Sequence, residues 1–403
     1  MNKTGVFFLL LLISFYAKAQ LKIQLSPNVS VGVSRNLETY FFVEKLAVER
    51  IDNYVFDIKG TDYSHQPVVY FGFKRFRKYQ NDPIIIRAAA ILKQVRDSLH
   101  DNGPVMEYLL NQKEFPAIGT RFFHSNNQQG TDLVRAKLQP LFAELTDSLR
   151  KFYIAADVAG FIRSNSQLYI GALNEVVKDI NKSSFQFMEK WYGQEFTAYE
   201  LYISPAMPIT PGEDSYRGFG PQISSPNGKI PSMIVSSSKM VPFQNNLSLY
   251  KQFGFNNPEV TKMIFSHEVA HSFVNPILEK YTSEIKADSL FYTKELQEIL
   301  APNYIGDWYV TVIEHLVRLG EIRVAVARKD YKEAESLREI HIDTYKCVLI
   351  PLLEKKIEEY ESNRSRYLTF ESYVPNLVRY FHSLSPKIIN DQIVKYKNYK
   401  TGR

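Results

Sequence analysis

Cysteine is nearly absent from this sequence. Cys347 is the single cysteine among 403 residues, so no disulfide can form within the chain. It lies in the apolar stretch "YKCVLIPLL", a setting typical of a buried structural thiol rather than of a catalytic nucleophile. The fold must therefore be stabilised by a hydrophobic core. The chain has ample material for one, because 45% of its residues are hydrophobic, including 26 tyrosines and 27 phenylalanines.

Low-complexity segments, internal repeats and a large net charge are also missing. The net charge is +6, 23% of the residues are charged, and the basic residues are dispersed along the chain. This composition excludes a largely disordered chain. It also argues against a nucleic-acid partner, because proteins that bind nucleic acids concentrate positive charge in one stripe or patch.

Long apolar runs are missing except at the N-terminus. There, the mainly apolar run Val6–Tyr16 follows Lys3 and precedes Ala17-Lys18-Ala19. This order is typical of a secretory signal peptide, and we expect residues 1–19 to be removed; a retained anchor is the alternative. No cysteine follows the run, which excludes lipid attachment there, and no later segment reaches the apolar length of a transmembrane helix. We therefore expect an exported, periplasmic or secreted protein with no membrane span.

The remaining sequence alternates between helix-like and strand-like patterns of hydrophobic residues. Helical spacing dominates to about residue 190 and returns after Asn257. Between these parts, and once near the start, the pattern alternates as in strands, with an Asn227-Gly228 turn signal; these segments are 21–34, 196–209, 216–225 and 230–239. Short connections favour antiparallel pairing. The predicted fold class is α+β, mainly helical, with a small antiparallel sheet preceding a helix that carries two histidines.

The change from helix-like to strand-like patterns near residue 195 also suggests that the chain has two regions. Residues 20–195 form the mainly helical N-terminal region, and residues 196–403 form the region that contains the histidine helix. The two regions are alternatively one continuous domain, in which the N-terminal helices pack directly on the second half.

The stretch "FSHEVAHSFVNP", residues 265–276, contains His267-Glu268-Val269-Ala270-His271. Asn257 and Pro258 are good residues to begin a helix, and Asn275-Pro276 is a plausible stop, which predicts a helix over 258–274. Apolar residues surround most of this helix, so we expect it to be buried.

Two histidines four residues apart lie one turn apart on one helix face. There, two imidazole nitrogens can reach one Zn²⁺, as His267 and His271 would. Glu268 is the residue after the first histidine, a position that favours a general base acting on a water molecule rather than a ligand. The alternative is a buried helix whose histidines hydrogen-bond to carboxylates or carbonyls. The position of the motif in the middle of a helix, after a short sheet, favours zinc.

A catalytic zinc site needs three protein ligands and an open position. The third histidine of the metzincins is absent, because Val274 stands where glycine would be and Leu278 where that histidine would be. A helix predicted to begin at Asp307, "DWYVTVIEHLVRLGEIRVAVA", supplies the candidate Glu314. A carboxylate among apolar residues needs a partner, and zinc would be one.

Other assignments remain open on this helix. Glu314 could instead form a solvent-facing ion pair with Arg318, one turn later. Glu321 is the second candidate for the third ligand and His315 is the third candidate. Several side chains could donate to a transition-state oxyanion, and the sequence does not choose among them: Tyr309, Arg318, Tyr380 and His382. Residues 231–239 are the nearest strand that could hold a substrate by strand addition, or they form an ordinary sheet strand.

These residues carry a resemblance to known families. The motif "HEVAH" with a glutamate on a following helix resembles the gluzincin group of zinc metallopeptidases, although the 43 positions from His271 to Glu314 exceed the spacing of its compact members. More closely, "VGVSRNLETYFFVEKLA", "HEVAHSFVNP" and "EHLVR" resemble an uncharacterised domain-of-unknown-function family of exported bacterial proteins regarded as zinc metallopeptidases. The resemblance covers roughly residues 30–340. It implies His267, His271 and Glu314 as zinc ligands and Glu268 as base, and no known substrate.

The sequence therefore predicts an exported zinc-dependent metallopeptidase that hydrolyses a peptide or protein substrate. No signature of an exopeptidase pocket is present, which favours an endopeptidase. Two alternatives remain: a catalytically silent cell-envelope protein that binds peptide or glycan, and a zinc hydrolase that acts on a non-peptide amide. A closed shell of four protein ligands would favour the silent protein.

Overall fold

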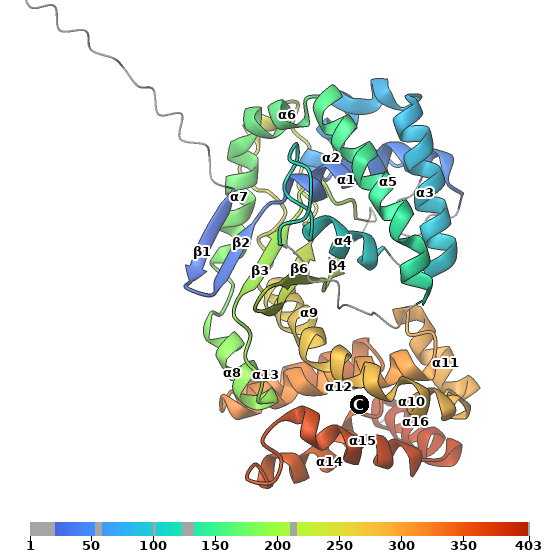
Figure 1. The fold of residues 1–403 in the computed structure, drawn as a ribbon. Coiled ribbons are helices and arrows are strands. Elements are labelled where there is room, and N and C mark those ends of the chain that lie inside the picture. The colour runs from blue at the N-terminus through green and yellow to red at the C-terminus, as the bar shows by residue number, and fades with distance from the viewer. Residues whose placement is uncertain (1–20, 53–58, 100–101, 123–132, 210–215, 402–403) are drawn as a thin grey trace, which may run out of the picture.

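The computed structural model describes residues 21–52, 59–99, 102–122, 133–209 and 216–401. The predicted signal peptide, residues 1–19, lies outside these ranges. Within them, no helix combines the length and hydrophobicity needed to cross a bilayer. The fold is mainly helical, with one small sheet that precedes the histidine-bearing helix in the chain, as the sequence predicts (Figure 1).

Helices precede and follow the central part of the sheet. Those before it are α1 (Arg35–Ala47), α2 (Pro67–Phe76), α3 (Pro83–Leu99), α4 (Gly103–Leu110), α5 (Leu133–Ala155), α6 (Val158–Ser164), α7 (Ser166–Val177) and α8 (Ser183–Tyr192). Those after it are α9 (Pro258–Leu278), α10 (Thr282–Ala287), α11 (Lys294–Leu300), α12 (Trp308–Ala327), α13 (Tyr331–Glu339), the π-helical turn η7 (Ile340–Thr344), α14 (Ile350–Ser362), α15 (Phe370–His382) and α16 (Pro386–Thr401).

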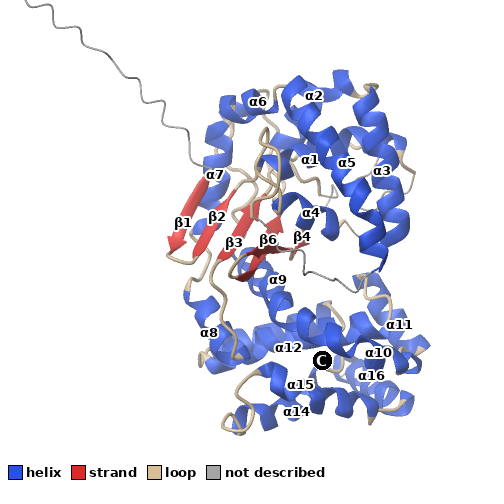
Figure 2. Cartoon of the chain, viewed as in Figure 1, coloured by secondary structure: helices blue, strands red, loops and turns tan. Residues whose placement is uncertain are grey.

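The sheet is mixed rather than antiparallel throughout. Its order is β1 (Lys22–Ser26), β2 (Val29–Gly32), β3 (Tyr199–Ile203), β6 (Gly228–Val235) and β4 (Gly218–Phe219), and β5 (Gln222–Ser225) also pairs with β6. The pairs β2–β3 and β3–β6 are parallel, and the other pairs are antiparallel (Figure 2). Parallel pairing is possible because the chain passes through helices α1 to α8 between β2 and β3, and through β4 and β5 between β3 and β6.

The strand expected over residues 231–239 lies inside the sheet. Strand β6, which covers most of residues 231–239, has β3 on one side and β4 and β5 on the other. Of the two alternatives for these residues, the structure shows the ordinary sheet strand, because residues 216–225 fold back and cover that side of β6. The edge of the sheet nearest the histidine helix is β4.

The sheet separates two hydrophobic cores. Because side chains alternate along a strand, Leu201, Met233 and Val235 belong to the core shared with α9 and α12, whereas Tyr202 and Ile234 belong to the core of the N-terminal helices. Figure 1 shows α1, α3 and α5 on one side of the sheet and α9, α12 and the C-terminal helices on the other. Strands from both halves of the sequence thus build the sheet on which α9 packs.

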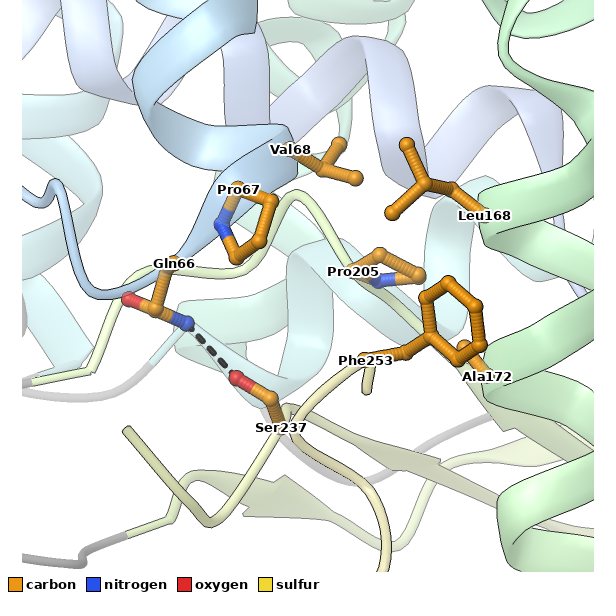
Figure 3. A pocket seen from close by; sticks show the side chains of 8 residues that line it. All are labelled: Gln66, Pro67, Val68, Leu168, Ala172, Pro205, Ser237 and Phe253. Carbon is orange, nitrogen blue, oxygen red and sulfur yellow. Dashed lines mark hydrogen bonds between the residues drawn. The ribbon is translucent and has the colours of Figure 1, made fainter. Parts of the chain in front are cut away.

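A buried amide fastens the start of α2 to the segments that follow β3 and β6. The side chain of Gln66 is 1% exposed. It donates to the carbonyl of Met207 at 3.0 Å and to Ser237 Oγ at 2.9 Å, and it accepts from the amide of Ile209 at 2.8 Å. The adjacent cavity of about 10 Å³, lined also by Leu168 and Phe253, holds one water molecule at most (Figure 3).

Candidate metal centre

Helix α9 begins where the sequence predicts and ends later. The Asn257 side chain caps it by accepting from the amide of Val260, and Pro258 occupies the first turn. The predicted end at residue 274 is wrong, because α9 continues through Pro276 to Leu278. A proline removes one backbone donor, and burial of the last turn in the core keeps the helix intact beyond it.

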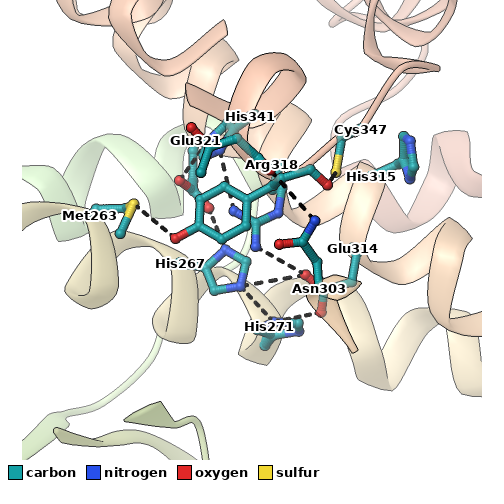
Figure 4. A network of polar contacts seen from close by, with 12 residues as sticks. Met263, His267, His271, Asn303, Glu314, His315, Arg318, Glu321, His341 and Cys347 are labelled. Carbon is teal, nitrogen blue, oxygen red and sulfur yellow. Dashed lines mark hydrogen bonds and ion pairs between the residues drawn. The ribbon is translucent and has the colours of Figure 1, made fainter. Parts of the chain in front are cut away.

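Helix α12 lies against α9 and presents its own polar residues to the two histidines. Asp307 caps it by accepting from the amide of Val310 at 2.7 Å. Glu314, Arg318 and Glu321 follow at intervals of four and three residues, so they line one face of this helix. Figure 4 shows these three side chains converging with His267 and His271.

Three side chains bring their donor atoms together. The Nε2 atoms of His267 and His271 are 3.2 Å apart. The two carboxylate oxygens of Glu314 lie 3.6 Å from Nε2 of His267 and 3.5 Å from Nε2 of His271. Ligand atoms about 2.0–2.1 Å from a tetrahedral zinc ion lie about 3.3 Å from one another. Each of the three residues offers one ligand atom within 4.8 Å of the others, and among the described residues this is the group that could hold one metal ion.

The second nitrogen of each imidazole is held by a further side chain. Nδ1 of His267 lies 2.6 Å from Oε1 of Glu321, and Nδ1 of His271 lies 3.1 Å from Oδ1 of Asn275. Both oxygens are acceptors, so the proton of each neutral ring resides on Nδ1. This tautomer leaves Nε2 of each ring free to bind a metal. The sequence suggested that the helix stops at Asn275-Pro276, and the structure instead places the Asn275 side chain beside His271.

Charge favours an ionised carboxylate in the centre. Burial alone would raise the pKa of the Glu314 carboxyl, but its neighbours, chiefly His271 and His267, outweigh that effect and hold the pKa below its usual range. The side chains of Glu314, His267 and His271 remain 18%, 13% and 15% exposed, so solvent reaches them. The centre therefore combines a ready anionic ligand with access from outside.

A second layer of buried charges lies behind the centre. Glu321, 1% exposed, contacts Nε2 of His341 at 2.9 Å as well as His267. Burial alone would raise the pKa of Glu321, yet His341 and His267 hold it well below its usual range. Burial lowers the pKa of His341, so its ring is neutral at neutral pH. Arg318 then donates to Nδ1 of His341 at 3.3 Å and lies 3.5 Å from Glu314.

The sequence indicated Arg318 and missed His341. Arg318 is 7% exposed and packs its guanidinium 3.7 Å from the centre of the Tyr345 ring. His341 comes from η7 and Tyr345 follows it directly, where no motif marked either residue. The fully buried position of a histidine could not be anticipated from the mostly polar sequence around it.

The other candidates lie elsewhere in the structure. His315 is fully buried and its Nδ1 lies 2.8 Å from the Thr311 carbonyl, within α12. The Tyr309 hydroxyl lies 3.3 Å from Thr282 Oγ1, and Nδ1 of His382 lies 2.7 Å from Asp288. Glu321 contacts a histidine from behind rather than joining the three ligand atoms.

Glu268 occupies the face of α9 that is turned toward β4. Its carboxylate lies beside Gly218 and Gly220, with no side chain of either residue between them. It is partly exposed. The residue predicted to act as base is therefore next to His267 in the sequence and lies partly exposed beside the sheet edge.

Comparison with known proteins identifies a family without identifying an activity. The model of the family described as "Domain of unknown function (DUF4932)" matches residues 44–380, and the chain belongs to that family. No curated protein and no solved structure matches the chain.

Proposed function

For this member of the DUF4932 family, we propose the function of an exported, zinc-dependent metallopeptidase of gluzincin type. One observation carries the proposal: two histidines of an HExxH helix and a glutamate of a later helix converge as three ligands, with Glu268 adjacent in the sequence. Three protein ligands with an open position are typical of catalytic zinc, whereas structural zinc is usually enclosed by four. Among the described residues no fourth ligand joins the group.

The chain's own residues would divide the work as follows. His267, His271 and Glu314 hold the ion, which, when bound, polarises a carbonyl and lowers the pKa of water. Glu268 accepts a proton from the attacking water at its carboxylate and then delivers it to the leaving amine. Glu321 and Asn275 keep the two imidazoles in the tautomer that binds metal.

Arg318 is our candidate for stabilising the negative charge that develops on the substrate. Its guanidinium lies 3.5 Å from Glu314 and donates to Nδ1 of His341 at 3.3 Å, so it is a fixed cation beside the three candidate ligands. A fixed donor beside the reacting carbonyl typically contributes about 10²–10³-fold to kcat. Arg318→Lys should lower kcat with little change in KM, and a change in KM alone would contradict this role.

The substrate proposal is a peptide or protein met outside the cytoplasm. A zinc hydrolase of non-peptide amides and a silent binding protein are the alternatives. The zinc-loaded chain, residues 20–403, should cleave members of a mixture of unstructured peptides, with products identified by mass spectrometry. His267→Ala should produce no cleavage. Cleavage of small amides without cleavage of peptides would favour the first alternative, and binding of peptide without turnover would favour the second.

A further inference from the structure

The segment Tyr216–Gly220 runs past Glu268 with its side chains alternating between two faces. Gly218 and Gly220 are turned toward α9. Arg217 and Phe219 are turned the other way, toward the N-terminal helices, and Phe219 belongs to their core. The alternation is that of a β-strand, of which Gly218–Phe219 form β4. The face toward Glu268 is therefore bare backbone at two successive positions.

Both oxygens of the Glu268 carboxylate lie close to this backbone. A methyl group added at Gly218 would lie 3.1 Å from Oε1 of Glu268. A methyl group added at Gly220 would lie 2.8 Å from Oε2 and 2.9 Å from the main-chain oxygen of the same residue. The two contacts at Gly220 are shorter than real side chains make without displacement of a neighbour, whereas the contact at Gly218 is tight and requires the carboxylate to shift by a few tenths of an ångström. Each glycine thus leaves room that one carboxylate oxygen of Glu268 uses.

The opposite face of the same segment is firmly anchored. Arg217 pairs with the fully buried Glu44 of α1 at 3.2 Å. Its main chain is also held, because the Ser236 amide donates to the Arg217 carbonyl at 3.0 Å and the Arg217 amide donates to Ser236 Oγ at 2.9 Å. Because Arg217 holds the segment on the side away from α9, the backbone cannot move away easily from a group that presses on its α9-facing side.

The start of the segment is tied to the helix that supplies the third ligand. The Tyr216 hydroxyl lies 2.5 Å from the Tyr345 hydroxyl. The Tyr345 ring packs against the Arg318 guanidinium, which in turn lies beside Glu314. The segment therefore contacts the base directly and the ligand Glu314 through two intermediaries.

We infer that Gly218 and Gly220 are positioning residues that form a side-chain-free wall fixing the Glu268 carboxylate, with Arg217 and Glu44 as its anchor. The inference rests on the proposed function, because it assigns the wall a role in placing the base. A carboxylate that has to take a proton from water and return it to an amine needs a defined position. A misplacement of about 1 Å can cost about 10²-fold in rate.

The test compares three glycine-to-alanine variants of the zinc-loaded chain, residues 20–403. Gly220→Ala and Gly218→Ala add a methyl group against Glu268. Gly306→Ala is the matched control, because a methyl group there meets nothing within 4 Å. We expect unchanged zinc content in all three, a fall of kcat by about 10²-fold for Gly220→Ala, a smaller fall for Gly218→Ala, and no change for the control. Activity equal to that of the control in both would overturn the inference.

A double-mutant cycle separates positioning from general damage. Gly218→Ala is suited to it, because the short contact it creates is with the Glu268 side chain alone. Glu268→Asp withdraws the carboxylate by one methylene group. It should lower kcat less in the Gly218→Ala background than in the unaltered chain, because the shorter side chain no longer meets the methyl group. Strictly additive effects would contradict the wall's role. If Gly220→Ala does not fold, Gly218→Ala alone decides whether the glycines position Glu268.

Failure of the proposed function can be distinguished from failure of the positioning inference. If the zinc-loaded unaltered chain cleaves no peptide, the function fails, and crystal structures of the two variants then decide the positioning. A displaced Glu268 carboxylate with His267 and His271 unmoved would support the wall. An unmoved carboxylate would overturn it.

Discussion

Glu321 accepts a hydrogen bond from Nδ1 of His267 across the α9–α12 interface, at 2.6 Å. The two residues are 54 positions apart in the chain, yet this contact determines which nitrogen of His267 is available to a metal. Glu321 is itself held by His341 on its other side. The His267 imidazole is therefore oriented by a carboxylate whose pKa its two histidine neighbours hold well below its usual range, against the effect of burial.

Removal of the Glu321 carboxylate should weaken metal binding without abolishing it. We expect Glu321→Ala to lower zinc affinity by about 10–100-fold, because His267 would lose its preferred tautomer and orientation. A competition titration with a zinc-binding dye measures the effect. Glu298→Ala, at an exposed glutamate, is the matched control. Unaltered affinity in Glu321→Ala would show that the contact is not a determinant of metal binding.

Glu268→Gln should separate metal binding from catalysis. The amide retains the shape of the side chain and cannot take a proton from water. We expect the metal content of the unaltered chain and a kcat at least about 10²–10⁴-fold lower. Metal analysis and a peptide-cleavage assay on the same preparation check the expected metal content and the expected loss of kcat. Full activity in this variant would refute the proposed mechanism.

A pH-dependent stability is expected from Glu38, which is fully buried in α1. Burial raises the pKa of its carboxyl from 4.5 to about 7, against the opposing effect of a hydrogen bond from Ser204. The folded state thus holds the proton more tightly than the unfolded state does. The resulting stabilisation is complete below pH 4.5 and is lost as the pH rises to about 7, by about 3 kcal/mol, because one pKa unit is worth about 1.4 kcal/mol.

Glu38→Gln removes this titration and serves as the comparison. Urea unfolding of both proteins at pH 4.5 and pH 7.5 gives the difference in the free energy of unfolding, in which contributions of all other groups cancel. The unaltered chain should lose about 3 kcal/mol relative to the variant over this interval. A difference that does not depend on pH would contradict the raised pKa.

The predicted division of the chain at residue 195 can be tested by truncation. Strand β3 pairs with β2 of the N-terminal region, and Arg217 pairs with Glu44. Loss of one partner of a buried ion pair alone costs about 3–5 kcal/mol. We expect residues 196–403 on their own to show no cooperative thermal unfolding by circular dichroism, in contrast to residues 20–403. A cooperative transition in the fragment would show that it is an independent domain.

Local patterns in the sequence predicted what depends on neighbours in the chain. Asn257 and Asp307 were expected to begin the two site helices, and both do, because a cap acts within one turn. The HExxH spacing placed His267 and His271 on one helix face for the same reason. The structure places Glu314 opposite both, which the apolar surroundings of a lone carboxylate had suggested.

Long-range pairing was beyond such patterns. The parallel pairing of β2 with β3 depends on contacts 170 positions apart, such as Val29 with Tyr199, and no local periodicity encodes them. The role of His341 depends in the same way on how η7 packs against α12. The end of α9 was misjudged because Pro276 is a local signal to stop, and burial of the following turn overrides it.

The most direct measurement is the zinc content of the tag-free chain, residues 20–403, by inductively coupled plasma mass spectrometry, alongside His267→Ala and Glu314→Ala. We expect about one zinc ion per unaltered chain, and loss of most of it in both variants. Absence of metal after incubation with zinc would refute the proposed metal centre, because the two histidines would then be only part of a buried helix. Zinc retained in both variants would place the metal elsewhere.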